Sequence, residues 1–338
     1  MSAAEEVVAE GHERVEAVPK RAMTLGTTTS LVVLAALLIV PVFAKNFIIF
    51  QITMLLIYGL AVLALNILTG GSGQFSLGQS AFYAVGAYTA AVLMEQFNVN
   101  YALTLPIAGV ICFGFGYLFG KPALRLSGVY LALATFALAT AMPQLLKLNF
   151  LEHWTGGVQG LVVTKPDAPF GLKVSQDTWL YYFTLAVTVA IYIFSVNLLR
   201  SRSGRAFMAI RDNEIAASSM GVNVALYKTL AFGVSAGITG VSGALGAIAV
   251  QFVAPDSYTI TLAISLFLGM VVGGVGWLPG SFVGAAFIIF VPNIAESISK
   301  GLSGAVFGVL LFLVIFLVPH GARQVAIVSQ QLLGKLRK

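Results

Sequence analysis

The sequence has very little charge. Only 9% of its 338 residues are Asp, Glu, Lys or Arg, whereas 58% are hydrophobic. A soluble domain carries about 25% charged residues. So few charges cannot cover the water-facing surface of a chain this long. The composition therefore excludes a soluble globular protein and indicates a membrane protein.

Cysteine and histidine are also scarce. The single cysteine, Cys112, excludes a disulfide framework and a Cys-based metal site. His12, His153 and His320 lie outside the apolar runs or at their ends, and no pair of carboxylates lies within such a run. This argues against an integral membrane enzyme and a proton-driven carrier, because both place ionisable groups at membrane depth. An ATP-independent carrier or channel that coordinates ions through backbone carbonyls stays open as an alternative.

The sequence lacks a phosphate-binding loop. Its glycine-rich stretch at 70–78 matches neither Gly-x-Gly-x-x-Gly nor Gly-x-x-x-x-Gly-Lys-Ser/Thr, and no strand pattern precedes it. We therefore expect no cofactor in this chain, and any ATP and Mg that drive transport must bind partner subunits. The net charge of +6 indicates orientation in a membrane rather than nucleic-acid binding.

Long apolar runs are what the sequence does have. A membrane-spanning helix needs about 20 mostly apolar residues. Ten candidates occur, at 30–44, 47–69, 75–94, 101–120, 126–147, 179–199, 226–252, 259–276, 280–297 and 301–318. The third opens with polar residues, so it either spans the membrane or is re-entrant. The prediction is an all-α polytopic integral membrane protein with about ten transmembrane helices.

The basic residues predict the orientation. Lys and Arg gather before the first run, after the fourth, after the sixth and after the last, at Lys20, Arg21, Lys121, Arg125, Arg200, Arg202, Arg205, Arg211, Lys228, Arg323, Lys335, Arg337 and Lys338. Ten spans with both termini in the cytoplasm put all of these inside, as the positive-inside bias requires; eight spans would also do so.

Three regions follow from this pattern. Residues 1–29 form an acidic, polar N-terminus that we expect to be flexible and cytoplasmic. Residues 30–320 form the transmembrane domain, and 321–338 form a basic cytoplasmic tail. Residues 20–44 imitate a signal peptide, but a retained first helix is the simpler interpretation because the start is acidic rather than basic.

Glycines four residues apart recur within the apolar runs. The pairs are Gly116–Gly120, Gly233–Gly237, Gly269–Gly273, Gly276–Gly280 and Gly280–Gly284. Small residues let helices approach closely in lipid, so these pairs predict helix–helix contacts.

The loop at 200–225 is the longest predicted cytoplasmic segment, and its composition favours a helix. Ser203 is a candidate N-cap and Gly221 a candidate stop. Such an amphipathic helix could dock into a groove of a soluble partner, with Phe207, Ile210, Arg211 and Glu214 as the expected anchors. The alternative is a basic surface helix that only fixes the topology.

A polar band interrupts the apolar runs between residues 66 and 89. It places hydrogen-bonding groups at membrane depth, at Asn66, Gln74, Ser76, Gln79, Ser80 and Tyr83. Unsatisfied polar groups there cost several kcal/mol (about 2–7 for an amide or hydroxyl), so they must face protein or water. The band either borders a translocation pathway or forms interhelical hydrogen bonds.

Several separate motifs stand out in the sequence. They are Gly-Gln-Phe-Ser-Leu-Gly-Gln-Ser-Ala-Phe at 73–82, Gly-Arg-Ala-Phe-Met-Ala-Ile-Arg-Asp-Asn-Glu-Ile-Ala-Ala at 204–217, Gly-Val-Asn at 221–223, Tyr-Lys at 227–228, and the stretches 122–130, 155–161 and 273–280. Together these motifs resemble one transporter family, the LivM type of branched-chain amino acid ABC transporter permease. The similarity covers roughly residues 45 to 320, and residues 1–29 and the basic tail match no pattern of the family.

The resemblance implies an ABC importer permease fold in the bacterial inner membrane. It also implies a second, LivH-like permease subunit, two cytoplasmic ATPase subunits and a periplasmic solute-binding protein around this chain, which lipid surrounds. The loop would couple to the ATPase through Gly204, Arg205, Phe207, Ile210, Arg211, Asp212, Asn213, Glu214, Ala216, Ala217 and Gly221. The expected solute is a branched-chain or other hydrophobic amino acid, with urea, short amides and aromatic acids as alternatives.

Overall fold

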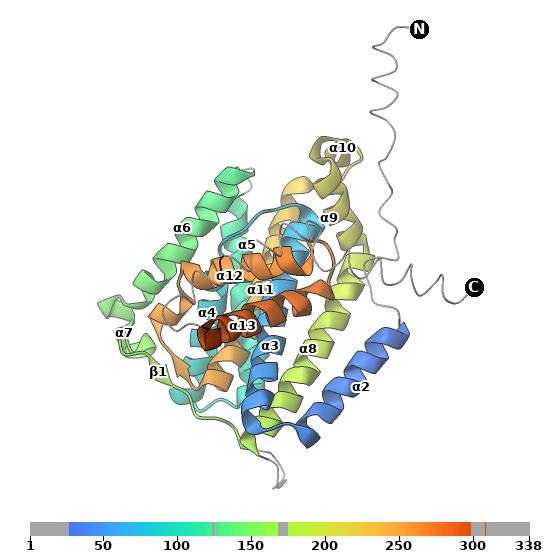
Figure 1. Cartoon of the computed structure of the whole chain (residues 1–338). Helices are drawn as coiled ribbons and strands as arrows, with labels where there is room; N and C mark the ends of the chain where they lie inside the picture. The colour runs from blue at the N-terminus through green and yellow to red at the C-terminus, as the bar shows by residue number, and fades with distance from the viewer. Residues whose placement is uncertain (1–26, 124–125, 127, 168–174, 299–307, 309–338) are drawn as a thin grey trace, which may run out of the picture.

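Helices make up nearly all of the described protein (Figure 1). The computed structural model describes residues 27–123, 126, 128–167, 175–298 and 308. The expected last span at 301–318, the basic tail and nearly all of the acidic N-terminus lie outside these residues.

The elements follow one another in a simple order. They are α2 (Thr27–Phe43), α3 (Asn46–Asn66), the π-helical turn η1 (Ile67–Gly71), α4 (Gln79–Glu95), α5 (Tyr101–Ala123), α6 (Val129–Leu146), α7 (Asn149–Thr155), β1 (Leu161–Val162), α8 (Gln176–Arg200), α9 (Arg202–Asp212), α10 (Glu214–Ser219), α11 (Val224–Val250), β2 (Phe252–Val253), the 3₁₀ turn η3 (Pro255–Tyr258), α12 (Ile260–Gly273) and α13 (Gly280–Ile298).

Helices α3 and α11 form the centre of the molecule. Their most apolar stretches are 67% and 83% buried, whereas those of α5 and α8 are each 28% buried. Small residues explain the position of α11, because glycine lets neighbouring backbones come close. A Cβ atom on Gly86 of α4, for example, would lie 2.0 Å from the oxygen of Gly240 on α11.

The predicted glycine contacts are confirmed at two further interfaces. A Cβ atom on Gly116 of α5 would lie 2.3 Å from Cβ of Ala236 on α11. One on Gly284 of α13 would lie 1.9 Å from the oxygen of Gly269 on α12. Neither site can hold a larger residue without a shift of the helices.

The structure supports a multi-pass membrane protein. Within the described ranges, six helices are long and apolar enough to cross a membrane: α3 with η1, α5, α6, α8, α11, and η3 with α12. Helices α2 and α13 contain shorter apolar stretches, Val32–Pro41 and Gly280–Ile294. Each of the first nine predicted spans falls on a described helix, while the number ten and the orientation of the termini stay predictions.

The third predicted span, 75–94, is corrected at its start. Helix α4 begins only at Gln79 and has 17 residues, which is about 26 Å of helix. Residues 73–78 form no helix. Gly73 there has φ +73°, a left-handed conformation that favours glycine, so the chain changes direction before α4 begins.

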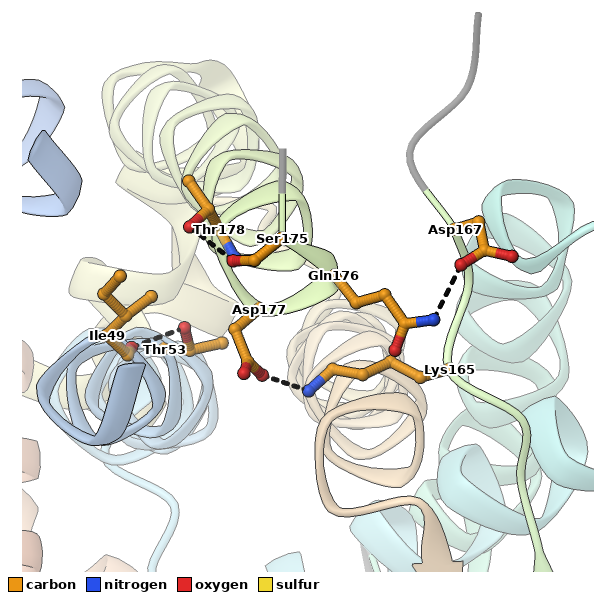
Figure 2. A network of polar contacts seen from close by, with 8 residues as sticks. All are labelled: Ile49, Thr53, Lys165, Asp167, Ser175, Gln176, Asp177 and Thr178. Carbon is orange, nitrogen blue, oxygen red and sulfur yellow. Dashed lines mark hydrogen bonds and ion pairs between the residues drawn. The ribbon is translucent and has the colours of Figure 1, made fainter. Parts of the chain in front are cut away.

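At the end of the molecule opposite α10, polar contacts hold the start of α8 and residues 165–167, which precede it in the sequence (Figure 2). Lys165 forms an ion pair with Asp177, and Gln176 Nε2 donates to Asp167 Oδ1 at 2.6 Å. Ser175 caps α8 by accepting the amide hydrogen of Thr178 at 3.2 Å.

A two-stranded antiparallel ribbon adds to this end. Strand β1 pairs with β2, so that Leu161 lies opposite Val253. The glycine-rich motif at 155–161 leads into β1, and a Cβ atom on Gly160 would lie 2.4 Å from the oxygen of Val253. The motif therefore joins the α6–α7 region to the end of α11.

Candidate transport and coupling site

The polar band lies where α3 ends and α4 begins. The last turn of α3 widens into η1, and residues 73–78, which form no regular element, follow. π-helical turns mark places where a helix is interrupted, frequently at functional sites. Here the interruption brings polar side chains into the centre of the bundle.

Hydrogen bonds fix both the side chain and the main chain of Gln74. Its Nε2 donates to Ser72 Oγ at 2.9 Å and to the main-chain oxygen of Lys228 at 3.1 Å. Its own main-chain oxygen accepts from Thr69 Oγ1 at 3.0 Å. Gln74 therefore ties the interruption to the start of α11.

Gln79, at the first turn of α4, connects to two residues of α11. Its Nε2 donates to Ser235 Oγ at 2.9 Å, and its Oε1 accepts from Thr239 Oγ1 at 2.7 Å. Ser235 Oγ in turn donates to the main-chain oxygen of Ala64 on α3 at 2.8 Å. One glutamine amide thus links α3, α4 and α11, and Gln79 is only 1% exposed.

Ser76 and Ser80 are fully buried as well. Ser76 Oγ accepts the amide hydrogen of Gly78 at 3.2 Å, and the neighbouring Leu77 amide donates to Thr135 Oγ1 of α6 at 2.9 Å. Within the part of the chain that the structure describes, the hydroxyl of Ser80 has no hydrogen-bond partner.

Asn66 joins α3 to the turn between α12 and α13. Its Oδ1 accepts from the amide of Gly276 at 2.7 Å. Its Nδ2 lies within hydrogen-bonding distance of the main-chain oxygens of Gly274, at 3.3 Å, and Trp277, at 3.1 Å. Asn66 therefore holds two chain segments that are more than 200 residues apart in the sequence.

Tyr83 belongs to a cluster of four tyrosines. Its ring stacks on Tyr58 of α3 with centroids 6.1 Å apart and lies 5.8 Å from Tyr258 of η3. Tyr88 meets Tyr258 edge to face at 6.2 Å, and its buried hydroxyl has no hydrogen-bond partner among the described residues. Tyr83 thus connects the polar band to Tyr58 of α3 and Tyr258 of η3.

The structure brings the polar band together but does not open it to solvent. Asn66, Gln74, Ser76, Gln79, Ser80 and Tyr83 are all buried, and most of their polar atoms are satisfied by protein groups. In this conformation they brace α3, α4 and α11. Sequence reasoning missed their partners Ser235 and Thr239, whose four-residue spacing along one helical run was the available signal.

The segment that the sequence predicts to be cytoplasmic is two helices rather than one. Helix α9 ends at Asp212, Asn213 adopts an extended conformation with φ −159°, and α10 begins at Glu214. We call α9 and α10, with the bend at Asn213, the elbow. It stands at one end of the molecule (Figure 1).

The predicted N-cap of this segment is corrected. Ser201, not Ser203, accepts the amide hydrogen of Gly204 at 3.4 Å, because α9 starts at Arg202. Asn213 caps α10 by accepting from the amide of Ala216 at 3.0 Å. The predicted stop is confirmed: Gly221 has φ +83° just after α10.

Two of the four predicted anchors are buried inside this chain. Phe207 is fully buried and Ile210 is 4% exposed, and the Phe207 ring packs edge to face against Tyr227 of α11. Both fill the interior of this chain because α9 lies against its own membrane domain. Their burial gives them an internal packing role in this conformation, and their role as anchors for a partner stays a prediction.

The other two predicted anchors make contacts within the chain. Arg211 Nη1 donates to the main-chain oxygen of Gly70 at 2.8 Å, and its Nη2 pairs with Asp212 at 2.9 Å. Glu214 pairs with Lys228 at 2.6 Å. Of the remaining residues expected to couple, Gly204 and Ala217 are buried, and Arg205, Asp212, Asn213, Ala216 and Gly221 are exposed.

Apolar residues that sequence reasoning did not single out as anchors project from the elbow. Ile215 is 80% and Met220 86% exposed. A groove beside them is lined by Asn213, Glu214, Ile215, Ser218 and Val224. Exposed apolar side chains beside a groove are typical of a protein contact surface.

The described residues hold no group of three His, Cys, Asp or Glu side chains that could bind a metal ion.

Comparison with known proteins gives one consistent family. Residues 47–318 match the family described as branched-chain amino acid transport system / permease component. The high-affinity branched-chain amino acid transport system permease protein LivM of Salmonella typhimurium is 35% identical over 247 residues, which are 66% of this chain and 58% of that protein.

Two further relatives have other names. The probable branched-chain amino acid transport permease protein LivH of Methanocaldococcus jannaschii is 26% identical over 240 residues, covering 68% of this chain and 73% of that protein. The autoinducer 2 import system permease protein LsrC of Escherichia coli is 27% identical over 262 residues, covering 75% and 72%. No solved structure matches the chain significantly.

Proposed function

The chain belongs to the branched-chain amino acid transport permease family, and from this we propose that it is the membrane-spanning subunit of an ATP-driven importer. It carries no phosphate-binding loop. Energy must therefore come from separate ATPase subunits that bind ATP and Mg, and the elbow is the surface that contacts them.

The exposed apolar tip of the elbow is the observation that carries this proposal. Ile215 and Met220 point away from the rest of the chain on a helix bent off the membrane domain. Interfaces concentrate their binding energy in a few anchors that fill pockets on the partner. Ile215 and Met220 take the anchor role, and the groove beside them receives a side chain of the ATPase.

We propose branched-chain or other hydrophobic amino acids as the solutes. The support is the 35% identity to LivM, whose name states that substrate class. The similarity to LsrC, a permease named for autoinducer 2, indicates that the fold also serves other small solutes. Urea, short amides and aromatic acids therefore stay as alternatives.

The proposed complex contains a second permease subunit, which the similarity to LivH supports, and a periplasmic solute-binding protein. The proposed mechanism is alternating access in the inner membrane. ATP binding closes the ATPase pair, and the elbow moves with it. The buried polar band near Gln79 then becomes accessible to the solute. Alternatively, the band stays closed and braces the helices that move around it.

The test is recovery of the ATPase subunits with the tagged permease complex from membranes. Ile215→Asp and Met220→Asp, singly and together, place a charge on the contact surface. We expect the double variant to recover roughly tenfold less ATPase, because desolvating an unpaired carboxylate at an interface is costly.

The matched control is Val162→Asp. Val162 is 68% exposed on β1, at the opposite end of the molecule, and should leave ATPase recovery unchanged. Full recovery of ATPase with the Ile215 and Met220 double variant, together with ATP-driven leucine uptake at the wild-type rate, would contradict the elbow as the contact surface.

A further inference from the structure

Arg211 reaches from the elbow into the membrane domain. Its Nη1 donates to the main-chain oxygen of Gly70 at 2.8 Å. Its Nε and Nη2 both donate to Asp212, at 3.0 and 2.9 Å, which orients the guanidinium. The contact is tight, because a Cβ atom on Gly73 would lie 3.0 Å from Cγ of Arg211.

A second connection runs beside the first. Glu214, just after the bend, pairs with Lys228 at 2.6 Å. The main-chain oxygen of Lys228 accepts from Gln74 Nε2 at 3.1 Å. Residues on both sides of the bend at Asn213 are thus connected to one short stretch of chain, residues 70–74, which we call the junction.

The junction is suited to movement. It contains the end of the π-helical turn η1 and the left-handed Gly73, and no regular helix follows it until Gln79. Helix interruptions absorb backbone rotation that a continuous α-helix resists. A displacement of residues 70–74 therefore changes the angle between α3 and the start of α4.

The arginine is committed to internal contacts. Three of its N–H groups bond within this chain, and its side chain is only 30% exposed, although Arg211 lies next to the exposed bend. The donor on Nη1 is directed into this chain, at the main-chain oxygen of Gly70.

We propose that Arg211 is a positioning residue that transmits movement of the elbow to the junction between α3 and α4, and so to the polar band. This rests on the proposed function, since it takes the elbow as the element that the ATPase moves. Ile215 and Met220 bind the ATPase, and Arg211 passes the displacement on.

The experiment measures three quantities for the complete complex in proteoliposomes: ATPase subunits retained, ATP hydrolysed, and labelled leucine taken up per ATP. Arg211→Ala and Arg211→Met both remove the hydrogen bond to Gly70, and Met keeps much of the side-chain length. Lys121→Ala is the control, because Lys121 is an exposed cation in the last turn of α5, outside the elbow and outside the residues expected to couple.

We expect both Arg211 variants to retain the ATPase and to hydrolyse ATP, while leucine uptake per ATP falls roughly tenfold, the scale of one charge-assisted hydrogen bond. Arg211→Lys, which keeps one cationic donor, should recover part of the ratio. Lys121→Ala should keep the wild-type ratio. If Arg211→Ala fails to insert, Arg211→Met decides the result.

Two results would overturn the inference. One is a wild-type ratio in Arg211→Met. The other is loss of the ATPase from Arg211 variants to the same extent as from the Ile215 and Met220 variants, which would make Arg211 a docking residue. Failure of the proposed function looks different, because the wild-type complex would then show no ATP-dependent uptake at all.

Discussion

Oδ1 of Asn66 accepts the amide hydrogen of Gly276 at 2.7 Å, across 210 residues of sequence. The contact joins the end of α3 to the turn before α13, and both ends are glycine-rich. The backbones come very close there, since a Cβ atom on Gly70 would lie 2.5 Å from the nitrogen of Gly276. Asn66 supplies the polar partner that this turn needs at membrane depth.

Replacing Asn66 should destabilise the protein. Asn66→Ala leaves the part-buried Gly276 amide without this acceptor, a loss of about 1–3 kcal/mol. The measurement is the thermal unfolding midpoint in detergent. Asn197→Ala, at an exposed position of α8, is the matched control and should change the midpoint little. Equal midpoints for both variants would contradict the structural role of Asn66.

Cysteines in the polar band test whether it borders the solute path. Ser76→Cys and Ser80→Cys, in a Cys112→Ala background, should be protected without nucleotide, because both positions are fully buried in this conformation. They should react with small aqueous thiol reagents during ATP turnover. Phe75→Cys is the neighbouring control, since Phe75 is 49% exposed. Protection of both serine positions in every state would leave the band a purely structural brace.

The ion pair between Glu214 and Lys228 predicts a rescue. The Glu214 side chain is 53% exposed, so the pair should contribute only about 0–1 kcal/mol to stability, but it connects α10 to α11. Glu214→Lys should therefore reduce leucine uptake with little effect on thermal stability. Adding Lys228→Glu should restore uptake. If the exchanged pair transports no better than Glu214→Lys alone, Glu214 contacts another subunit instead.

At the opposite end of the molecule, the pair of Lys165 and Asp177 should contribute more to stability. The Lys165 side chain is only 9% exposed, so Asp177→Asn leaves a largely buried ammonium group without its counter-charge. We expect a loss of about 1–3 kcal/mol, seen as a lower unfolding midpoint. Asp167→Asn nearby keeps an acceptor for Gln176 and should change the midpoint less (Figure 2). The reverse order of the two effects would contradict this assignment.

The positions of the helices could largely be predicted from the sequence. Apolar runs of sufficient length have few alternatives to a helix in lipid, because every backbone polar group must be satisfied internally. The start of α4 was placed too early, because residues 75–78 are apolar enough to extend a run. Gly73 and Gly78 carried the opposing signal, since glycine favours breaks.

The helical structure of the elbow could be predicted from the sequence, but not which way its side chains face. Amphipathic spacing correctly indicated helical structure at 202–219, yet Phe207 and Ile210 could equally face a partner or this chain. The bend at Asn213 turns α10 outward and leaves α9 against α11. Such a choice depends on neighbours that are distant in the sequence.

By itself, the sequence determined the class of this protein: a helical membrane protein without its own phosphate-binding loop or buried ionisable site. Composition decides the class, because the fraction of charged residues and the length of the apolar runs determine whether a chain can face water or lipid. Only the tertiary structure decided which polar groups meet. Gln79 finds Ser235 and Thr239, and Arg211 finds Gly70, because helix packing brings together donors and acceptors that no local pattern connects.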